Sequence, residues 1–337
     1  MKKSDIIIKR AGVAQSVEQL IRNQQVTGSS PVTSSTSPEI FLGAYLLLSG
    51  DSMDLCNLSV IKQIMSDAGI TFRKEFGQNF LINRMIPEDI ADSCADEENS
   101  LIIEIGPGIG CLTQELAIRY KKVVAIEIDK GLIPVLNKTL AEYDNITVIN
   151  ADVMETDIQA IVDEYSDGMP VSVCANLPYY ITTPILMRLL ESGVKFSSIT
   201  VMVQNEVAAR LCAAPGKSDY GAITAVLGYY GSVRRLFKVS AGSFIPAPKV
   251  DSAVIRIDMY PEPIYHPKNE KFFRDLIKAA FEMRRKTLVN AVNAKFPQIE
   301  KGRIVDVIAS LGFDTNVRGE RLSTLDFINL SDALLSF

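Results

Sequence analysis

The chain has 337 residues, 47% of them hydrophobic, which is enough to bury a sizeable core in two domains or one enlarged α/β domain. No apolar run approaches the eighteen or so residues of a membrane span, so we expect no membrane segment. Five scattered cysteines form no CxxC pair, and His266 is the single histidine. These counts argue against a disulfide framework, a metal site and a Ser-His-Asp triad, and they favour a reducing cytoplasm.

The formal net charge of −5 is unevenly distributed. Residues 82–175 carry eighteen Asp and Glu against six Lys and Arg, whereas residues 231–304 carry seven against fifteen. A basic region in an acidic protein is typical of a surface that holds a phosphate backbone. A solvated charged surface explains the same asymmetry equally well.

Residues 1–52 differ from the rest of the chain. The stretch from Gln15 to Ser37 is polar, rich in Ser and Thr, and aperiodic, so it cannot supply a core. The overlapping segment from Val13 to Ser34 also resembles a recurrent conceptual translation of a transfer-RNA gene. We therefore expect residues 1–52 to be a disordered leader, or not to be translated at all, with Met53 as the true start.

Periodic patterns begin after Leu55, with a short helix from Val60 to Ile70 and a basic, aromatic turn from Arg73 to Gly77. Helices and apolar strands then alternate, which predicts a parallel, doubly wound, Rossmann-like α/β sheet over residues 53–261. The predicted strands are Leu101–Ile105, Val123–Ile126, Ile146–Ile149, Val171–Ala175, Ser198–Val203, Arg235–Val239 and Val254–Met259, and the early helices are Pro87–Ala95 and Leu112–Tyr120.

After Pro263 the pattern contains helices alone. The predicted helices are Asn269–Phe281, Arg285–Ala294, Gly302–Leu311 and Leu325–Leu335. We therefore expect a small, all-helical C-terminal domain over residues 262–337, within the basic part of the chain.

Three glycines, Gly106, Gly108 and Gly110, follow the first predicted strand of the sheet and let the backbone turn close to a ligand. A purely structural turn remains an alternative, because a glycine-rich turn alone is a weak signal. Glu127 closes the second strand, where an acid can accept hydrogen bonds from ribose hydroxyls. Asp152 closes the third strand, where it could accept from the amine of an adenine.

The ligand that fits this edge of the sheet is S-adenosylmethionine. Nothing in the pattern requires a pyrophosphate, and no Walker sequence is present. The positive sulfonium group suits the acidic half of the chain, and we expect Glu104 to support the glycine loop or the ligand's amino end.

The segment Asn176-Leu-Pro-Tyr-Tyr180 follows the fourth strand at the same edge. The Asn176 oxygen and the Leu177 carbonyl are two acceptors, because Pro178 has no amide hydrogen to offer, and Tyr179 is a flat apolar face. Two acceptors can localise the lone pair of an exocyclic amine, and an aromatic face can stack on an extruded base. This predicts in-line methyl transfer to a base amine without a metal; the alternative is a plain strand-ending turn with a packed tyrosine.

In their order along the chain, the motifs resemble those of the ribosomal RNA adenine N6,N6-dimethyltransferases of the KsgA/RsmA type, from about Leu55 to the end. They are Phe76-Gly-Gln-Asn-Phe-Leu81, Glu104-Ile-Gly-Pro-Gly-Ile-Gly110, Glu127-Ile-Asp129, Asn150-Ala-Asp152, Asn176-Leu-Pro-Tyr-Tyr180, Phe244-Ile-Pro-Ala-Pro-Lys-Val-Asp-Ser-Ala-Val254 and Phe281-Glu-Met-Arg-Arg-Lys-Thr-Leu288. The resemblance implies dimethylation of two adjacent adenines near the 3′ end of small-subunit (16S) ribosomal RNA, during maturation of the immature small subunit.

The resemblance also implies roles for individual residues. The implied cofactor contacts are Asn79, Leu81, Gly106, Glu127, Asp152 and Asn176. Asn176 and Tyr179 would hold the target base, with Phe244 as a second aromatic wall, and the implied phosphate contacts are Arg284, Arg285 and Lys286. A solvated helix start is the alternative for that basic triplet. Asn205 departs from the pattern, because many relatives are expected to carry a basic residue there.

Two rivals remain at this point. One is the antibiotic-resistance dimethylase that acts on large-subunit ribosomal RNA, which shares the cofactor and base-handling parts. The other is a non-catalytic RNA-binding assembly factor, or a transcription factor, derived from the same fold. We expect the protein to act as a monomer.

Overall fold

The computed structural model describes residues 53–70 and 78–335. The predicted leader and the basic turn Arg73 to Gly77 lie outside the described residues. The described residues belong to two compact units, one with residues 53–70 and the other with residues 78–335. In the first unit, α3 (Leu58–Asp67) is capped by the Asn57 side chain, which accepts hydrogen bonds from two backbone amides of the first turn. The predicted helix is therefore confirmed, although it begins and ends a few residues earlier.

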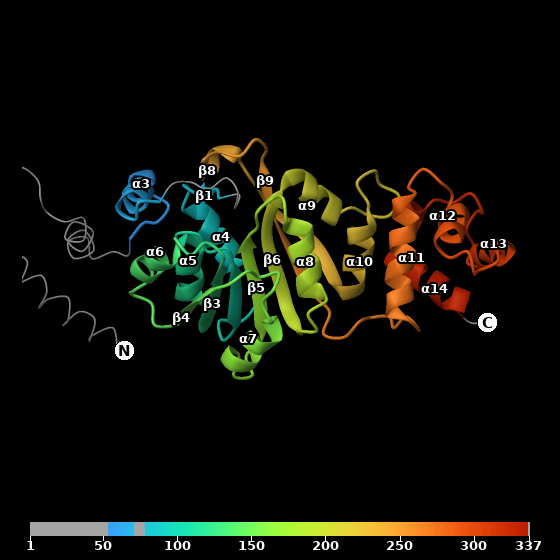
Figure 1. Cartoon of the computed structure of the whole chain (residues 1–337), viewed down its shortest axis with the longest axis horizontal. Helices are drawn as coiled ribbons and strands as arrows, with labels where there is room; N and C mark the ends of the chain where they lie inside the picture. The colour runs from blue at the N-terminus through green and yellow to red at the C-terminus, as the bar shows by residue number, and fades with distance from the viewer. Residues whose placement is uncertain (1–52, 71–77, 336–337) are drawn as a thin grey trace, which may run out of the picture. The chain divides into compact units, whose positions relative to one another are not determined.

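The second unit is built on a seven-stranded sheet with the order β4-β3-β2-β5-β6-β9-β7 (Figure 1). The strands are β2 (Leu101–Ile105), β3 (Lys122–Glu127), β4 (Ile146–Asn150), β5 (Val171–Asn176), β6 (Phe196–Gln204), β7 (Gly231–Val239) and β9 (Ser252–Met259). All the predicted strands are present, and the β2, β3, β4, β5 and β6 pairs are parallel. The central strands are apolar because helices cover both of their faces.

The prediction of a wholly parallel sheet is wrong at one edge, since β9 runs antiparallel to both β6 and β7. A parallel pair needs a crossover connection, usually a helix. Between β7 and β9 the chain forms a three-residue 3₁₀ helix, η2 (Ala241–Ser243), and the two-residue strand β8 (Phe244–Ile245). This segment contains no α-helix that could carry the chain across the sheet.

Helices lie on both faces of the sheet. They are α4 (Met85–Asp92), α5 (Cys111–Arg119), α6 (Ile133–Thr139), α7 (Ile158–Tyr165), α8 (Thr182–Leu190), α9 (Asn205–Leu211) and α10 (Ala222–Tyr230). Side chains of α7 to α10 share one buried apolar cluster with one face of the sheet. On the opposite face, the Ser198 and Thr200 hydroxyls of β6 donate to the carbonyls of Cys94 and Ser93, just after α4.

A second sheet of two strands joins distant parts of the chain. β1 (Phe80–Leu81) pairs with β8, so that Leu81 lies opposite Phe244 and Phe80 opposite Ile245. This pairing fixes the segment before α4 beside the carboxyl edge of the main sheet. Sequence periodicity could not predict it, because two residues define no alternation.

The C-terminal helices pack on α10. They are α11 (Glu270–Glu282), α12 (Leu288–Lys295), α13 (Lys301–Ser310) and α14 (Thr324–Leu335), with the 3₁₀ helix η3 (Gly319–Arg321) between the last two. Their apolar cluster includes Ala225, Val226 and Tyr229 of α10, whereas Leu227 faces the cluster of the sheet. α10 therefore connects the two cores, and a domain boundary at residue 262 stays a prediction.

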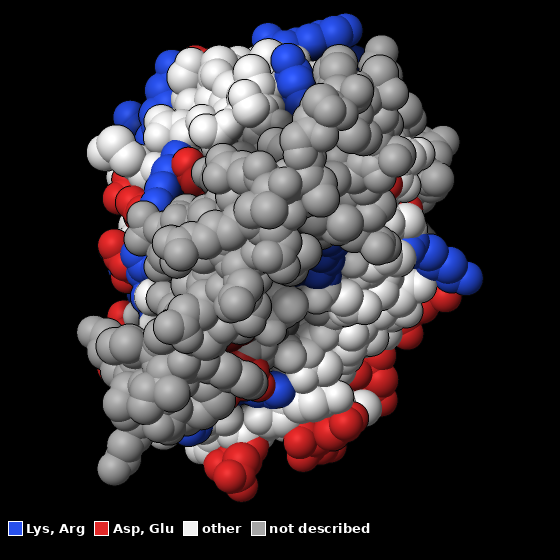
Figure 2. All heavy atoms as spheres, turned by 90° about the vertical axis from the view of Figure 1, so that its left-hand side faces the viewer, with Lys and Arg blue, Asp and Glu red and all other residues white. Residues whose placement is uncertain are grey.

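On the face drawn in Figure 2, acidic side chains gather at the lower end, whereas Lys and Arg side chains are prominent at the upper end. No helix among the described residues is long and apolar enough to cross a bilayer.

Candidate active site

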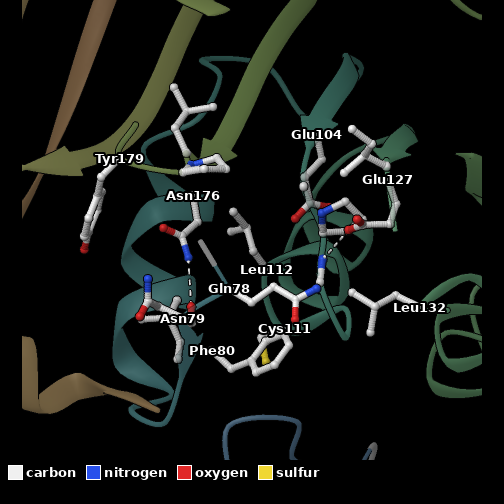
Figure 3. A pocket seen from close by; sticks show the side chains of 17 residues that line it. Gln78, Asn79, Phe80, Glu104, Cys111, Leu112, Glu127, Leu132, Asn176 and Tyr179 are labelled. Carbon is white, nitrogen blue, oxygen red and sulfur yellow. Dashed lines mark hydrogen bonds between the residues drawn. The ribbon is translucent and has the colours of Figure 1, made fainter. Parts of the chain in front are cut away.

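A pocket opens at the carboxyl ends of β2, β3 and β5, with β1 along one side (Figure 3). Strand ends, the glycine loop and the start of α5 form its walls. The lining residues are Gln78, Asn79, Phe80, Leu81, Glu104, Gly106, Pro107, Gly108, Cys111, Leu112, Glu127, Ile128, Leu132, Asn176, Leu177, Pro178 and Tyr179. Ligands of doubly wound sheets bind at this edge, so the pocket lies where the sequence places the cofactor.

The glycine loop needs its glycines for two physical reasons. Gly106, Gly108 and Gly110 have φ values of 69°, 64° and 98°, a left-handed region that side chains disfavour. A Cβ on Gly108 would also lie 3.0 Å from the Phe80 ring. The loop can thus pass close to β1 and lead directly into α5.

Glu127 joins the loop to the end of β3. Its Oε2 accepts a hydrogen bond from the Gly108 amide at 3.1 Å, and its Oε1 accepts one from the Asp129 amide at 2.8 Å. Burial raises the pKa of the Glu127 carboxyl, and these two hydrogen bonds offset part of the increase. Each oxygen retains a further lone pair, so Glu127 can still accept from a ligand in the pocket.

Glu104 is a buried acid with an unsatisfied oxygen. Its side chain is 1% exposed, and Oε2 has no hydrogen-bond partner among the described residues. Burial raises the pKa of this carboxyl to about 8; the nearby Thr113 hydroxyl opposes the increase, and the charge of Glu127 adds to it. The Thr113 hydroxyl itself does not reach hydrogen-bond geometry. Because Glu104 lines the pocket, a cationic or hydrogen-bond-donating ligand would satisfy it, which fits S-adenosylmethionine.

Asn176 ends β5 with its amide in the pocket. Its Nδ2 donates to the Asn79 carbonyl at 3.3 Å, so its Oδ1 is left as an acceptor on the side that faces Tyr179 (Figure 3). The Leu177 amide donates to Met202 in β6 at 3.2 Å, and no hydrogen bond to the Leu177 carbonyl is found among the described residues. Asn176 and Leu177 both line the pocket, and the joint action of their two oxygens on one amine stays a prediction.

The two aromatic residues predicted for the base site differ in their surroundings. The Tyr179 ring lines the pocket, and its hydroxyl lies 2.6 Å from Ser252 Oγ of β9. Burial raises the pKa of the Tyr179 hydroxyl, and the hydrogen bond with Ser252 partly offsets this. Phe244 is 3% exposed and pairs with Leu81, but it is not among the lining residues.

The pocket brings together most of the predicted cofactor residues but not Asp152. Asp152 follows β4, and its Oδ1 accepts from the Met154 amide at 2.8 Å. Several lining residues carry no predicted role: Gln78, Phe80, Cys111, Leu112 and Leu132. Gln78 and Phe80 lie in the motif from Phe76 to Leu81, which could have indicated that they line the site. In the sequence, the other three resemble ordinary core residues.

The basic triplet lies in the turn between α11 and α12, not at a helix start as the alternative supposed. Arg284 forms an ion pair with Glu320 at 2.9 Å and also donates to the Ser218 carbonyl. Arg285 and Lys286 are exposed, and neither forms an ion pair with another described residue. These two cations are therefore available to an external anion.

Among residues 53–70 and 78–335, no three His, Cys, Asp or Glu side chains cluster in a way that could hold a metal ion.

A sheet of parallel strands with one antiparallel strand, β9, and a glycine loop after β2, places the protein in the class of Rossmann-like methyltransferases. The family model for "Ribosomal RNA adenine dimethylase" matches residues 69–333, and the chain belongs to this family. The family resemblance, the fold class and the enzyme class predicted from the sequence are thereby confirmed.

Relatives and solved structures agree with this assignment. The chain is 45% identical over 273 residues to ribosomal RNA small subunit methyltransferase A of Alkaliphilus metalliredigens, covering 81% of this chain and 95% of the relative. A dimethyladenosine transferase from Plasmodium falciparum is 27% identical, with a TM-score of 0.65 over 74% of this chain and 95% of that structure. The 23S rRNA methyltransferase ErmE is 25% identical, with a TM-score of 0.59 over 76% of this chain and 99% of that structure.

Proposed function

We propose that this protein transfers methyl groups from S-adenosylmethionine to N6 of two adjacent adenines near the 3′ end of small-subunit (16S) ribosomal RNA. The products are N6,N6-dimethyladenosines, made on the immature small subunit in the cytoplasm, by a monomer. One observation of the site carries the proposal: Asn176 ends β5 in the pocket, and because its Nδ2 donates to the Asn79 carbonyl, its Oδ1 is left as an acceptor. The name of the bacterial relative, at 45% identity, supports the small subunit as the target.

Asn176 and Leu177 act on the target amine. In the first transfer their two oxygens accept its two hydrogens, which directs the nitrogen lone pair out of the ring plane toward the methyl donor, and in the second transfer one of them accepts the hydrogen that remains. When bound, S-adenosylmethionine supplies an electrophilic methyl group on its sulfonium. A neutral acceptor is enough, because the amine hydrogen becomes acidic as the nitrogen gains positive charge and is then lost as a proton to water. The transfer as proposed needs no metal.

Tyr179 holds the extruded adenine by stacking. The hydrogen bond to Ser252 fixes the hydroxyl end of the ring, so the ring is positioned before the base arrives. Phe244 stays a proposed second wall. It is anchored by the β1–β8 pairing opposite Leu81, which itself lines the pocket.

The cofactor contacts follow from the pocket. Glu127 would accept from the ribose hydroxyls through the lone pairs that Gly108 and Asp129 leave free, and Glu104 would face a positive group of the ligand. We assign Asn79, Leu81 and Gly106 to the pocket wall. Asp152 is proposed for the adenine end, which lies beyond the residues that line the pocket.

Arg285 and Lys286 are the proposed phosphate contacts, because they are exposed and free of ion pairs among the described residues. Arg284 contributes less in this proposal, since Glu320 neutralises it.

The large-subunit dimethylase is the nearest rival, and the chain is more similar to the small-subunit relative than to ErmE. One assay separates the candidates: labelled S-adenosylmethionine is incubated with the protein and either unmodified small subunits or large subunits. We expect label in the small subunit at two adjacent adenines. Label in the large subunit alone would establish the rival, and RNA binding without label would identify a non-catalytic assembly factor.

A further inference from the structure

The loop after β5 carries two consecutive tyrosines in opposite environments. Tyr179 lines the pocket, and its hydroxyl is bonded to Ser252. Tyr180 is 64% exposed, and its side chain forms no hydrogen bond or ring contact with another described residue. The mechanism proposed above uses the first ring and leaves the second without a role.

Hydrogen bonds fix the backbone of the turn that carries Tyr180. The Pro178 carbonyl accepts from the Ile181 amide at 3.2 Å, which closes a turn around the two tyrosines. The same carbonyl accepts from the Thr182 hydroxyl at 3.1 Å, which ties the turn to the first residue of α8. The proline ring also fixes the backbone before the turn. Tyrosine has only two side-chain torsions, so a tyrosine ring on a fixed backbone loses little conformational entropy when it binds a partner.

The segment that leads to Ser252, the partner of Tyr179, carries both an exposed apolar side chain and an exposed cation. Val250 is 46% exposed and Lys249 is exposed, while Asp251 between Val250 and Ser252 forms an ion pair with Lys238. Aromatic and apolar side chains beside a cation bind single-stranded nucleic acid by stacking and by phosphate attraction, with little dependence on base identity. A ring next to the base pocket therefore fits a nucleobase better than a protein partner.

We propose that Tyr180 is a stacking platform for the nucleotide next to the target adenine, an inference that rests on the proposed function. Extruding one base removes a stacking partner from its neighbour, and the Tyr180 ring replaces that partner. The two adjacent adenines are then held together, one against Tyr179 and the other against Tyr180. Exchange of the two bases between the platform and the pocket would let both be methylated without release of the subunit.

The test compares Tyr180→Ala, Tyr180→Leu and Tyr180→Phe with the wild type, on unmodified small subunits with labelled S-adenosylmethionine. Tyr265→Ala is the matched control, since Tyr265 is also exposed, at 42%, and follows β9. The readouts are KM for subunits, kcat, cofactor affinity, melting temperature, and the fraction of RNA fragments with one adenine of the pair modified, measured by mass spectrometry.

We expect Tyr180→Ala to raise KM for subunits about tenfold, the effect of losing one base-stacking contact, and to increase the singly modified fraction. Tyr180→Phe should behave as the wild type because stacking needs the ring, with Tyr180→Leu between them and cofactor affinity unchanged throughout. The inference is overturned if Tyr180→Ala matches Tyr265→Ala, or if Tyr180→Phe is as impaired as Tyr180→Ala. A wild type that modifies no small subunit would instead overturn the proposed function, and this inference with it.

Discussion

The buried carboxyl of Glu104 should make the stability of the cofactor-free protein fall as pH rises. Its pKa is about 8 in the folded protein, against an ordinary value of 4.5 that we take for the unfolded chain. Between these two values the folded protein holds a proton that the unfolded chain has released, so raising the pH favours unfolding. The contribution is fully present below about pH 4.5 and is lost as the pH passes through about 8.

The size of the effect follows from the pKa difference. One pKa unit corresponds to about 1.4 kcal/mol, so the full window is worth on the order of 5 kcal/mol of unfolding free energy. The assay is urea unfolding of wild type and Glu104→Gln without cofactor, at about pH 5.5 and about pH 8.5. Because the amide of glutamine does not titrate, the wild type should lose stability relative to Glu104→Gln over this range. Glu97→Gln, on an exposed loop, serves as the control.

Parallel stability curves for wild type and Glu104→Gln would refute the reasoning, since they would show that Glu104 is charged in the folded protein throughout. A difference of the opposite sign would show that the folded state stabilises the charged carboxylate.

Three further predictions concern the base and the RNA. Asn176→Ala should lower single-turnover methylation by about 10²–10³-fold while equilibrium dialysis finds nearly unchanged cofactor affinity, because the amide acts on the target amine; weakened cofactor binding with unaltered chemistry would contradict this. Neutralising Arg285 and Lys286 to Gln should reduce the slope of log affinity against log salt by about 1 per phosphate contact, and Lys301→Gln should leave it unchanged; an unaltered slope in the double variant would place the RNA surface elsewhere. Tyr179→Phe should cost about 1 kcal/mol of unfolding free energy and keep most activity, whereas Tyr179→Ala should lose activity with the ring; equal activity losses in the two variants would show that the hydroxyl, not stacking, matters.

The main sheet was predictable because its strands are apolar runs that end in recognisable loops. Leu101–Ile105, for instance, is buried along its whole length and matches the predicted strand at both ends. The direction of β9 was not predictable from the alternation of strands and helices. That alternation does not indicate in which direction a strand runs when no helix precedes it. The β1–β8 pair was not predicted either, because its register depends on contacts between distant segments rather than on a local sequence pattern.

Some residues of the candidate site were likewise predictable from the sequence, and others were not. Glu127 and Asn176 are the last residues of β3 and β5, so their meeting at one edge follows from the topology. Leu112 and Leu132 line the same pocket, but in sequence an apolar wall residue looks like any other core residue. The unsatisfied oxygen of Glu104 was not visible either, because it depends on which donors fail to reach it.

The position of β9 between β6 and β7 has a consequence for the order in which the sheet can form while the chain is being synthesised. β6 ends at Gln204, but its neighbour β9 begins at Ser252, so the edge of β6 stays open while about fifty more residues are synthesised. At about 5–20 residues per second this interval lasts several seconds. β7 is completed earlier and must wait for β9 before it has a neighbour in the sheet. Since Ser252 also holds the Tyr179 hydroxyl, the nascent protein acquires its glycine loop well before it can finish the wall that receives the base.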